Sequence, residues 1–334
     1  MFKGKRVLLI LPRMFDYPSE MKKELEGMGA TVTWVPERPY NLLARIVRNY
    51  SPKWYARIAE KYLTRILERT EGMQLDYVLI IGSAIINAGF LKELRNGHKN
   101  ACLLTYQWDS NRLYPYFHLL EYFDKCFSFD FNDCRQTPRL SYHPLFYLER
   151  YKELRTQWNT VKKYDLLHVG SLHPERYEML QKAAAYCREN GITFYYYVYM
   201  PFASFLKHWI RGRRFTNVRF RKLNPGDILA LYSQANVILD LPQKGQTGLT
   251  MRTFEVLGAG KKLLTTNPWI EQTDFYNGNM IALCDLNKQE PFDSAFVKAI
   301  SGPSEAWLER MEKHSLRNWL LHMLSDTTVA TTSK

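Results

Sequence analysis

Short apolar runs alternate with helix-length amphipathic segments along this chain, and the alternation restricts the fold to a parallel α/β arrangement. The first run, Arg6–Leu11, is apolar enough for a strand that is buried on both faces of a sheet. A helix is predicted next, with Ser19 as its N-cap and Gly29 as its stop. The run Ala30–Val35 is rich in β-branched residues, which is typical of a second strand. This half is further expected to contain strands at 77–81, 101–106 and 125–129 and a helix at 52–70.

The same alternation restarts after a polar segment, residues 148–163, which we interpret as a joint between two domains. Strands are then expected at 164–169, 192–199, 237–240 and 262–265, and helices at 174–190 and 249–257. We therefore predict a doubly wound α/β protein with two Rossmann-like domains, residues 1–150 and 160–303, that face a central cleft. Near the end of the chain, one helix with a broad apolar surface is expected from Ser304 to Ser325.

Composition excludes several other classes of protein. Hydrophobic residues make up 46% and charged residues 24% of the 334 residues, which is an ordinary globular composition. No apolar run approaches the ~18–20 residues of a membrane span, and the N-terminal run is too short for a secretory signal. The five cysteines form no CxxC pair, so we expect reduced thiols in a cytoplasmic protein. The net charge of +13 favours an anionic partner, whether a nucleotide-carrying substrate, nucleic acid or an anionic membrane surface.

The most informative segment is a strand, a turn rich in Gly and Thr, and a helix, over residues 237–260. The free N–H groups of a helix N-terminus attract phosphate, and Gly245 and Gly248 allow the backbone to approach a ligand closely. Arg252 and Glu255 share one face of this helix, where they could hold a diphosphate and the ribose hydroxyls. A surface Arg–Glu pair on a packed helix explains the same residues equally well.

One block of this segment resembles a known family. Residues 252–267, RTFEVLGAGKKLLTTN, resemble the R-x-F-E-[AV]-L block of GT-B glycosyltransferases, with the closest likeness to the CgeB-like and bacterial surface-polysaccharide branches. Residues 165–176 look like a second block of these enzymes, and residues 106–110 and 128–133 look like N-terminal blocks. The resemblance implies a GT-B fold, a nucleotide-sugar donor bound by the C-terminal domain, and a last helix, within 304–330, that crosses back to the N-terminal domain.

The resemblance also implies a donor site. Glu255 would bond the ribose, and the base and diphosphate would lie among Gly170, Ser171, His173, Arg176, Lys244, Gly245, Thr247, Gly248, Leu249, Thr250 and Arg252. One position departs from the pattern, because many retaining relatives carry a Glu eight residues before Glu255 and this chain has Thr247. The resemblance therefore assigns neither the donor sugar nor a retaining outcome.

The expected chemistry needs no metal ion and no cofactor. Glycosyl transfer releases a nucleoside diphosphate, whose charge can be neutralised by Arg and Lys side chains and a helix N-terminus. Asp130 and Asp133 are the nearest approach to a pair of metal ligands, and we interpret them as turn and N-cap residues.

Acceptor-side candidates should follow the strands of the N-terminal half, because open α/β sheets bind ligands at the carboxyl ends of their strands. Asp16, Ser83 and Asp109 meet this criterion. We favour Asp109 as a base or as the group that orients the acceptor hydroxyl, with Asp16 as a second catalytic candidate; a carboxylate that caps the next helix explains Asp109 equally well. His143 is interpreted as structural.

Two basic stretches could contact anionic surfaces. Five cations lie four residues apart, at Lys53, Arg57, Lys61, Arg65 and Arg69, beside Trp54, Ile58, Tyr62 and Ile66. Such a helix could lie on anionic lipid, or it could be a packed helix with a solvated basic face. The second stretch, Lys207 to Lys222, has seven cations and no acid and could bind phosphates or membrane, or be an exposed excursion.

Three functions stay open from the sequence. The first is a glycosyltransferase that adds sugar to a growing, lipid-linked surface glycan at the inner membrane face. The second is an epimerase-like nucleotide-binding protein on the same frame. The third is a nucleic-acid-binding protein. No RNA- or DNA-binding motif supports it, so we expect no nucleic-acid partner.

Overall fold

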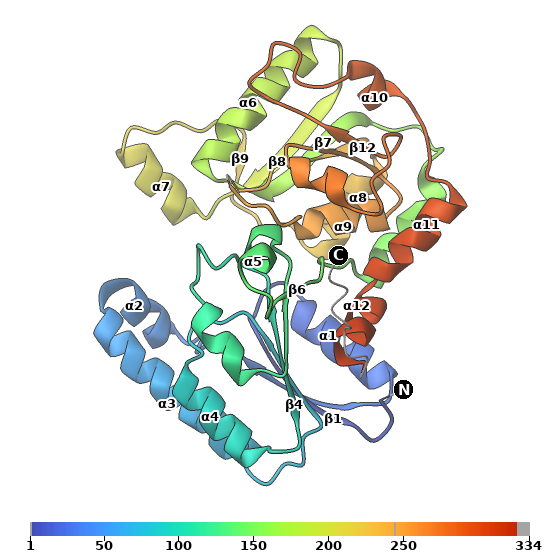
Figure 1. The fold of residues 1–334 in the computed structure, drawn as a ribbon. Helices are drawn as coiled ribbons and strands as arrows, with labels where there is room; N and C mark the ends of the chain where they lie inside the picture. Colours follow the sequence, from blue (N-terminus) through green and yellow to red (C-terminus); the bar gives the residue numbers. More distant parts are fainter. Residues whose placement is uncertain (1, 244, 326–334) are drawn as a thin grey trace. The chain divides into compact units, whose positions relative to one another are not determined.

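The computed structural model describes residues 2–243 and 245–325, which form two compact units. Of the described residues, the first unit contains 2–145 together with 316–325, and the second contains those between Phe146 and Ser315 (Figure 1). Each unit is built around one six-stranded sheet in which every neighbouring pair of strands is parallel.

The sheet of the first unit has the order β2-β1-β3-β4-β5-β6. Its strands are β1 (Arg6–Leu11), β2 (Thr31–Pro36), β3 (Tyr77–Ile81), β4 (Cys102–Gln107), β5 (Lys125–Ser128) and β6 (Ser141–Tyr142). Its helices are α1 (Tyr17–Gly27), α2 (Leu42–Tyr50), α3 (Pro52–Thr70), α4 (Ala88–Gly97), η1 (Phe117–Tyr122), α5 (Phe131–Gln136) and α12 (Leu316–Leu324). The Val, Leu and Ile side chains of β1, β3 and β4 are at most 1% exposed, as the strand patterns predict.

The sheet of the second unit has the order β12-β11-β10-β7-β8-β9. Its strands are β7 (Tyr164–Ser171), β8 (Phe194–Tyr199), β9 (Val218–Arg219), β10 (Ala235–Asp240), β11 (Lys262–Thr265) and β12 (Ile281–Leu283). Its helical segments are η2 (Glu149–Gln157), α6 (Pro174–Glu189), α7 (Phe202–Ile210), α8 (Pro225–Ser233), α9 (Met251–Gly258), η3 (Pro268–Gln272), α10 (Ser294–Lys298), α11 (Glu305–Met311) and η4 (Glu312–His314). Short strands such as β6, β9 and β12 lack a sequence pattern of their own and were not predicted.

In both sheets the order in which strands are added reverses beside the first strand, while all strands stay parallel. In the first unit the chain moves from β1 outward to β2 and then returns to β3 on the other side of β1. In the second unit it moves from β7 through β8 to β9 and then returns to β10 on the other side of β7. The crevice outside the carboxyl ends at such a switch point is where open α/β sheets bind ligands. We therefore expect ligand-binding sites at the carboxyl ends of β1 and β3 in the first unit and of β7 and β10 in the second.

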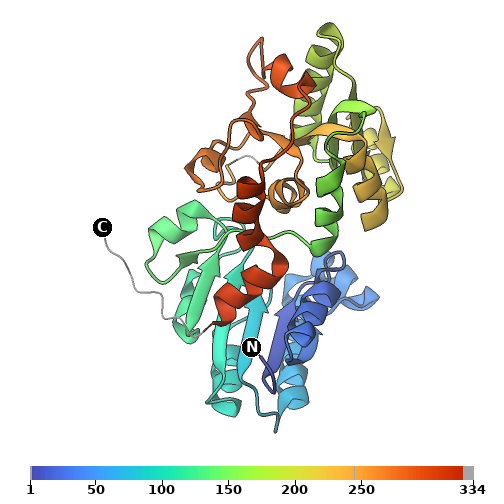
Figure 2. The ribbon, with the colours of Figure 1, turned by 90° about the vertical axis from the view of Figure 1, so that its right-hand side faces the viewer.

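The predicted single helix from Ser304 to Ser325 is wrong. Ser304 caps α11 as expected, but the backbone is extended at Ser315, where ψ is 149°, and α12 begins after this break. Trp307 ties α11 to the second unit by donating from Nε1 to the carbonyl of Phe275 at 2.9 Å. Of these segments, α12 belongs to the first unit, where it lies beside α1 (Figure 2). Trp319 of α12 packs on Tyr106, with ring centroids 4.7 Å apart. Residues 326–330 of the expected crossing segment lie outside the described residues.

The polar segment 148–163 was predicted to be a joint between domains, but it is a packed part of the second unit. Most of it forms η2, which belongs to the second unit. Arg155 donates from Nε to the carbonyl of Gly258 at 2.7 Å and pairs with Glu312 at 2.6 Å. The first unit accordingly ends at Leu145, before the predicted boundary at residue 150.

Candidate active site

At the switch point of the second unit, a buried carboxylate ends β10. Asp240 is 1% exposed, and its Oδ2 accepts hydrogen bonds from the hydroxyls of Thr250 at 2.6 Å and Thr253 at 3.1 Å. Its Oδ1 pairs with Nη1 of Arg252 at 3.1 Å. Three donors from one turn of chain thus surround Asp240 and fix the N-terminus of α9 against the end of the strand.

Arg252 lies close against the neighbouring strand, at Gly170. A Cβ on Gly170 would lie 3.1 Å from Nη2 of Arg252 and 3.2 Å from Nε2 of His168. Burial disfavours the charge on Arg252, but Asp240, Tyr232 and Glu255 outweigh it and raise the pKa of the guanidinium. Arg252 is therefore held charged, in a partly buried place, by its protein partners.

A second guanidinium faces this site from the first turn of α6. Burial, and then the charge of Arg252, lower the pKa of Arg176, although Asp240 acts in the opposite direction. The Nε of Arg176 is buried and has no hydrogen-bond partner among the residues that the structure describes. Two mutually repelling arginines with an unused donor form a place where an anion is stabilised. His173, at the N-cap position of α6, is affected too, because burial and Arg176 lower its pKa.

The turn before α9 is fastened by side chains. Asn267 donates from Nδ2 to the carbonyls of Thr247 and Gly248, each at 3.3 Å, and Gln246 donates to the carbonyl of Gly248 at 2.8 Å. Gly245 has a φ of 76°, a conformation that side chains disfavour. Thr250 caps the helix by accepting from the backbone N–H of Thr253 at 3.2 Å. The free N–H groups at the start of α9 are thereby presented beside Arg252.

The other predicted donor-site residues lie in different settings. Ser171 ends β7 and is exposed, so it lies at the same carboxyl edge as Gly170. Leu249 is 2% exposed, so its side chain belongs to the core and could not itself contact a ligand. Glu255 is half-buried on α9, three residues after Arg252, and its charge acts on Arg252 and Tyr232. Lys244 lies outside the described residues.

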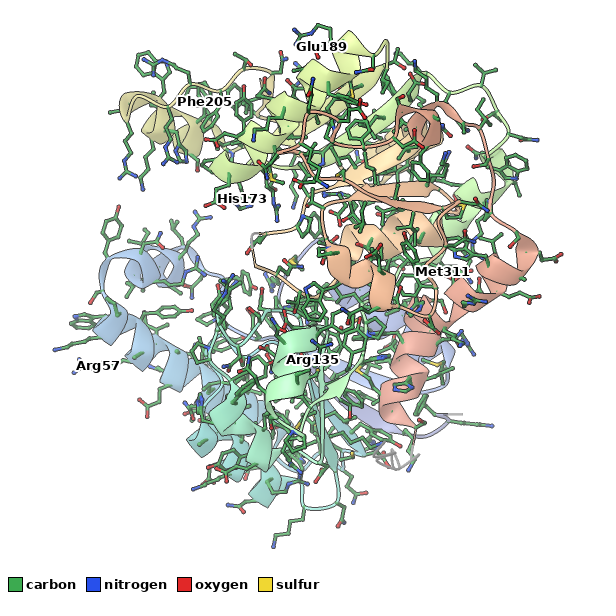
Figure 3. All side chains as sticks on the ribbon, turned by 45° about the horizontal axis from the view of Figure 1, so that its top comes forward. Arg57, Arg135, His173, Glu189, Phe205 and Met311 are labelled. Carbon is green, nitrogen blue, oxygen red and sulfur yellow. The ribbon has the colours of Figure 1, made fainter. Side chains whose placement is uncertain are left out.

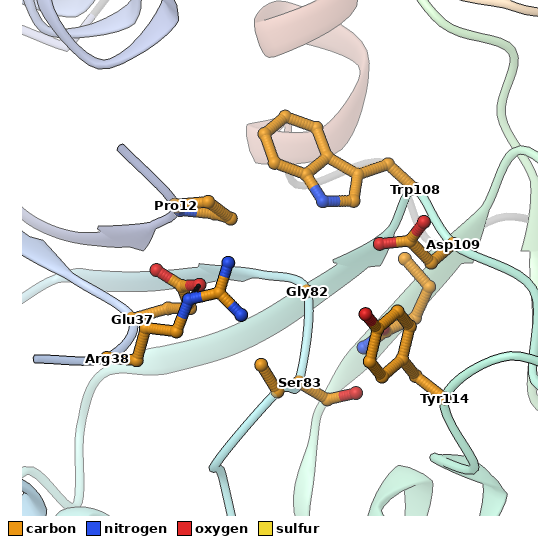
Figure 4. A pocket seen from close by; sticks show the side chains of 10 residues that line it. Pro12, Glu37, Arg38, Gly82, Ser83, Trp108, Asp109 and Tyr114 are labelled. Carbon is orange, nitrogen blue, oxygen red and sulfur yellow. Dashed lines mark ion pairs between the residues drawn. The ribbon is translucent and has the colours of Figure 1, made fainter. Parts of the chain in front are cut away.

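A pocket occupies the switch point of the first unit (Figure 4). It is lined by Pro12 after β1, Gly82, Ser83 and Ala84 after β3, Glu37 and Arg38 after β2, Gln107, Trp108 and Asp109 at the end of β4, and Tyr114. The hydroxyl of Ser83 is buried and has no hydrogen-bond partner within the described residues. The pocket therefore offers a free polar group in a partly buried setting.

Burial raises the pKa of Asp109, and the charge of Arg38 opposes this effect. In the described part of the chain, no group donates a hydrogen bond to this carboxylate, so it does not act as a helix cap. Figure 4 shows the guanidinium of Arg38 and the carboxylate of Asp109 entering the pocket from opposite sides. Ser83 and Asp109 are thus brought together as the strand ends predict.

Glu37 and Arg38 line this pocket and were not predicted as site residues. Glu37 is 1% exposed, pairs with Nε of Arg38 at 3.0 Å, and accepts from the hydroxyl of Tyr40 at 3.0 Å. Burial raises the pKa of Glu37, against the effects of Arg38 and Tyr40. A signal was available in the sequence, since the two residues lie two and three positions after the strand predicted at 30–35 and so fall at the same carboxyl edge.

Asp16 does not join this pocket. It occupies the N-cap position of α1, and its carbonyl accepts from the hydroxyl of Ser19 at 2.7 Å and from the N–H of Glu20. The helix begins two residues before Ser19, so the prediction of Ser19 as N-cap is wrong, and the loop that was expected to carry Asp16 toward a ligand is short. Asp16 is absent from the lining of the pocket as the structure describes it.

Asp130, Asp133 and His143 have structural partners. Asp130 caps α5 by accepting from the N–H groups of Asn132 and Asp133. Asp133 accepts from the hydroxyl of Tyr116 at 2.7 Å. His143 is buried and stacks on Trp319, with ring centroids 5.5 Å apart. Among the described residues, no three side chains of His, Cys, Asp or Glu are grouped as metal ligands would be.

Among the described residues, no helix is both long enough and apolar enough to cross a bilayer.

Comparison with known proteins identifies the fold. No family model matches the chain, and no curated protein is significantly similar to it. The structure of trehalose-6-phosphate from E. coli bound with UDP-2-fluoro glucose has a TM-score of 0.64 at 13% identity, covering 96% of this chain and 98% of that one. An alpha-glucosyltransferase in complex with UDP and a 13-mer DNA has a TM-score of 0.57 at 14% identity, over 96% and 95% of the two chains.

A third solved structure belongs to a different activity. UDP-GlcNAc 2-epimerase from Neisseria meningitidis, bound to UDP-GlcNAc, has a TM-score of 0.55 at 10% identity, over 96% of this chain and 99% of that one. At such low identity these likenesses concern the arrangement of the backbone. Together with the two parallel sheets and their flanking helices, they show that this chain has the GT-B fold of two Rossmann-like domains.

Proposed function

We propose that this protein is a glycosyltransferase that takes a sugar from a nucleotide-sugar donor. The observation that supports the proposal most is the pair of arginines at the β7–β10 switch point, Arg176 and Arg252, of which one keeps a buried donor without a partner. Solved structures of the same fold contain UDP or a UDP-sugar. A diphosphate is the ligand that two guanidinium groups and a helix N-terminus suit best.

In the proposed donor complex, the diphosphate lies between Arg176, Arg252 and the N–H groups at the start of α9. Glu255, one turn further along α9, accepts hydrogen bonds from the ribose hydroxyls. The base lies near the exposed loop after β7, with Ser171 and His173. When the bond between the anomeric carbon and the diphosphate oxygen breaks, the arginines stabilise the charge that develops on the leaving group. No metal ion or cofactor is part of this proposal.

The acceptor is proposed to enter the pocket of the first unit. Its hydroxyl would donate to Asp109, whose buried carboxylate is free to accept it, and neighbouring sugar hydroxyls would meet Ser83 and Arg38. Trp108 and Tyr114 add flat apolar surfaces of the kind on which sugar rings stack. By the resemblance of residues 252–267 to enzymes of surface-polysaccharide assembly, we propose a lipid-linked glycan as acceptor.

A lipid-linked acceptor implies a membrane surface, and the first unit has a face that suits one. All five cations of the basic ridge (Lys53, Arg57, Lys61, Arg65 and Arg69) are exposed on α3, and Arg57 marks this helix in Figure 3. The adjacent helix α2 exposes Leu42, Leu43 and Ile46 at 48–64% of their surface. We propose that this face rests on the anionic inner surface of the membrane.

Two measurements test the proposal. In a thermal-shift screen of UDP, GDP, CMP and dTDP and their sugars, a ligand at 100 times its dissociation constant stabilises the protein by about 2.7 kcal/mol. The matching donor should then be hydrolysed slowly without acceptor, releasing free sugar and nucleoside diphosphate. An epimerase, which the third comparison makes the second candidate, would instead convert the donor into its epimer. If no nucleotide stabilises the protein, the proposal is wrong.

A further inference from the structure

A second amphipathic element leaves the sheet of the other unit. After β8 the chain forms α7, turns, and returns through the edge strand β9. We call residues 201–222 the α7 excursion. Figure 1 shows α7 standing away from the strands of its own sheet, and Figure 3 marks it by Phe205. None of its residues takes part in the proposed donor site.

The inner side of the excursion is held in place by packing. Phe205 and Phe215 pack against the core of the second unit. His208 meets the ring of Phe215 at 5.6 Å, and the hydroxyl of Tyr177 bonds to that of Thr216 at 2.8 Å. The excursion is therefore a fixed part of the fold, and what it exposes on its other side is presented in a defined geometry.

The outer side of α7 is apolar and open. Phe202, Leu206, Trp209 and Ile210 follow the spacing i, i+4, i+7, i+8 and so share one face of the helix. They are 61%, 43%, 49% and 71% exposed, and Phe220 beside Phe202 is 47% exposed. No residue of α7 is buried. A contiguous group of large apolar side chains that water covers is typical of a binding surface.

Cations predominate beside this apolar face, and the first carboxylate that follows it in the sequence, Asp227, pairs with Arg221 at 3.2 Å. The segment from residue 190 to 226 contains no Asp or Glu and has seven cations, of which Lys207, Arg211, Arg213 and Arg214 lie in or directly after α7. All four are exposed, and the guanidinium of Arg214 covers the ring of Trp209 at 4.7 Å. The partner must therefore offer apolar volume and negative charge together.

An anionic bilayer surface fits both requirements. Its headgroups pair with the cations, and its acyl boundary accepts the apolar face of a helix that lies in the interface. Nucleic acid meets only the charge requirement and could stack on Trp209 and the phenylalanines, but it offers nothing to Leu206 and Ile210. The charge and the aliphatic side chains together favour lipid.

We propose that the α7 excursion is a membrane-binding element, through which the second unit attaches to an anionic bilayer independently of α2 and α3 in the first. Phe202, Leu206 and Ile210 enter the interface, Trp209 lies at the headgroup level, and the flanking cations pair with lipid phosphates. The element is separate from the donor site, so lipid binding does not depend on the proposed sugar transfer.

The test is sedimentation of the full-length protein with vesicles of phosphatidylcholine that contain phosphatidylglycerol. Replacing Leu206 and Ile210 by Ser should lower the partition coefficient at least tenfold. The matched control replaces Val161 and Ile300 by Ser, since these apolar side chains of the same unit are 96% and 61% exposed but lie outside the excursion. The control should bind vesicles within about twofold of the wild type. Equal binding by the α7 variant and the wild type overturns the proposal.

Tryptophan fluorescence gives a second readout that needs no destabilising change. Brominated lipids should quench the wild type, and Trp209→Phe should lose a defined part of that quenching. The same quenching in both proteins overturns the proposal, as does an α7 variant that loses affinity for an oligonucleotide while it keeps its affinity for vesicles. Nucleotide binding by the same proteins is measured in parallel. A protein that binds no nucleotide would contradict the donor proposal without changing the interpretation of the vesicle experiment.

Discussion

Gly170 and Arg252 are so close that the position of a Cβ on the glycine is 3.1 Å from Nη2 of the arginine. Gly170 belongs to β7 and Arg252 to α9, so this approach fixes the helix relative to the switch point of the sheet. The guanidinium group can hold Asp240 and still face the crevice because no side chain separates it from the strand.

Gly170→Ala should therefore weaken nucleotide binding. The added methyl group would lie 3.1 Å from Nη2 of Arg252, so the guanidinium must shift. The loss of up to one charge-assisted hydrogen bond, ~1.5–3 kcal/mol, corresponds to a dissociation constant that is weaker by up to roughly a hundredfold. Titration calorimetry measures this dissociation constant with the nucleotide that stabilises the wild type most in the thermal-shift screen. Gly278→Ala is the matched control, because nothing lies within 4 Å of a Cβ at that position. Equal losses in the two variants would mean that the approach has no part in binding.

Glu255→Ala should remain folded and lose affinity for nucleosides. If its carboxylate holds the ribose, binding of a nucleoside diphosphate weakens by about tenfold or more, whereas binding of inorganic pyrophosphate changes little. Glu178→Ala, an exposed position on α6, serves as control. A nucleotide dissociation constant equal to that of the wild type would remove Glu255 from the site.

Asp109→Asn should separate transfer from donor binding. A group that positions or deprotonates the acceptor hydroxyl contributes ~100-fold or more to the rate, so kcat for transfer should fall by about that factor while donor affinity is kept. Asp16→Asn should have little effect, since Asp16 does not line the pocket. If the two variants exchange these phenotypes, the acceptor site lies elsewhere.

Stability should fall as the pH is lowered below about 6.5, because two histidines of the second unit are buried in neutral form. Burial lowers the pKa of His168 to about 3 and that of His314 to about 4. The unfolded chain binds their protons at an ordinary pKa near 6.5 and the folded chain does not, so stability that is complete above 6.5 is lost on acidification. For His168 the loss at pH 5 is about 2 kcal/mol.

Replacing His168 by Asn tests the assignment, since the amide can donate to the carbonyl of Leu239 as Nδ1 does at 2.9 Å. Denaturant unfolding at pH 7.5 and pH 5 should show that the variant loses about 2 kcal/mol less than the wild type between the two values. An unchanged difference would show that His168 is protonated in the folded state.

Neutralising part of the basic ridge should weaken membrane binding and leave donor affinity intact. Each cation near an anionic surface contributes ~1 kcal/mol before screening, so replacing Arg57, Lys61 and Arg65 by Gln should lower vesicle binding by up to about 100-fold and flatten its dependence on salt. The control replaces Lys3, Lys23 and Lys99, which are exposed in the same unit, and changes net charge equally. If both triple variants bind alike, the ridge is a solvated face.

Much of this fold could be predicted because its long strands are apolar throughout and its sheets are parallel. The helix predicted at 52–70 is confirmed as α3, and the edge at which Ser83 and Asp109 meet follows from the strand ends. Local patterns did not reveal the break at Ser315, because apolar spacing continues through it and the extended backbone is set by packing on either side. Glu37 was missed for a related reason: a charged pair in a loop looks solvated until tertiary structure buries it.

The repulsion between Arg176 and Arg252 in the second unit also has a consequence for its energetics. Folding itself brings Arg176 toward Arg252, so the electrostatic cost of assembling two like charges is met before any ligand arrives. The site is preorganised, and an anion that enters it relieves an existing repulsion without having to rearrange the protein. In its free form the unit retains this repulsion, and the proposed diphosphate would supply the counterion of Arg176.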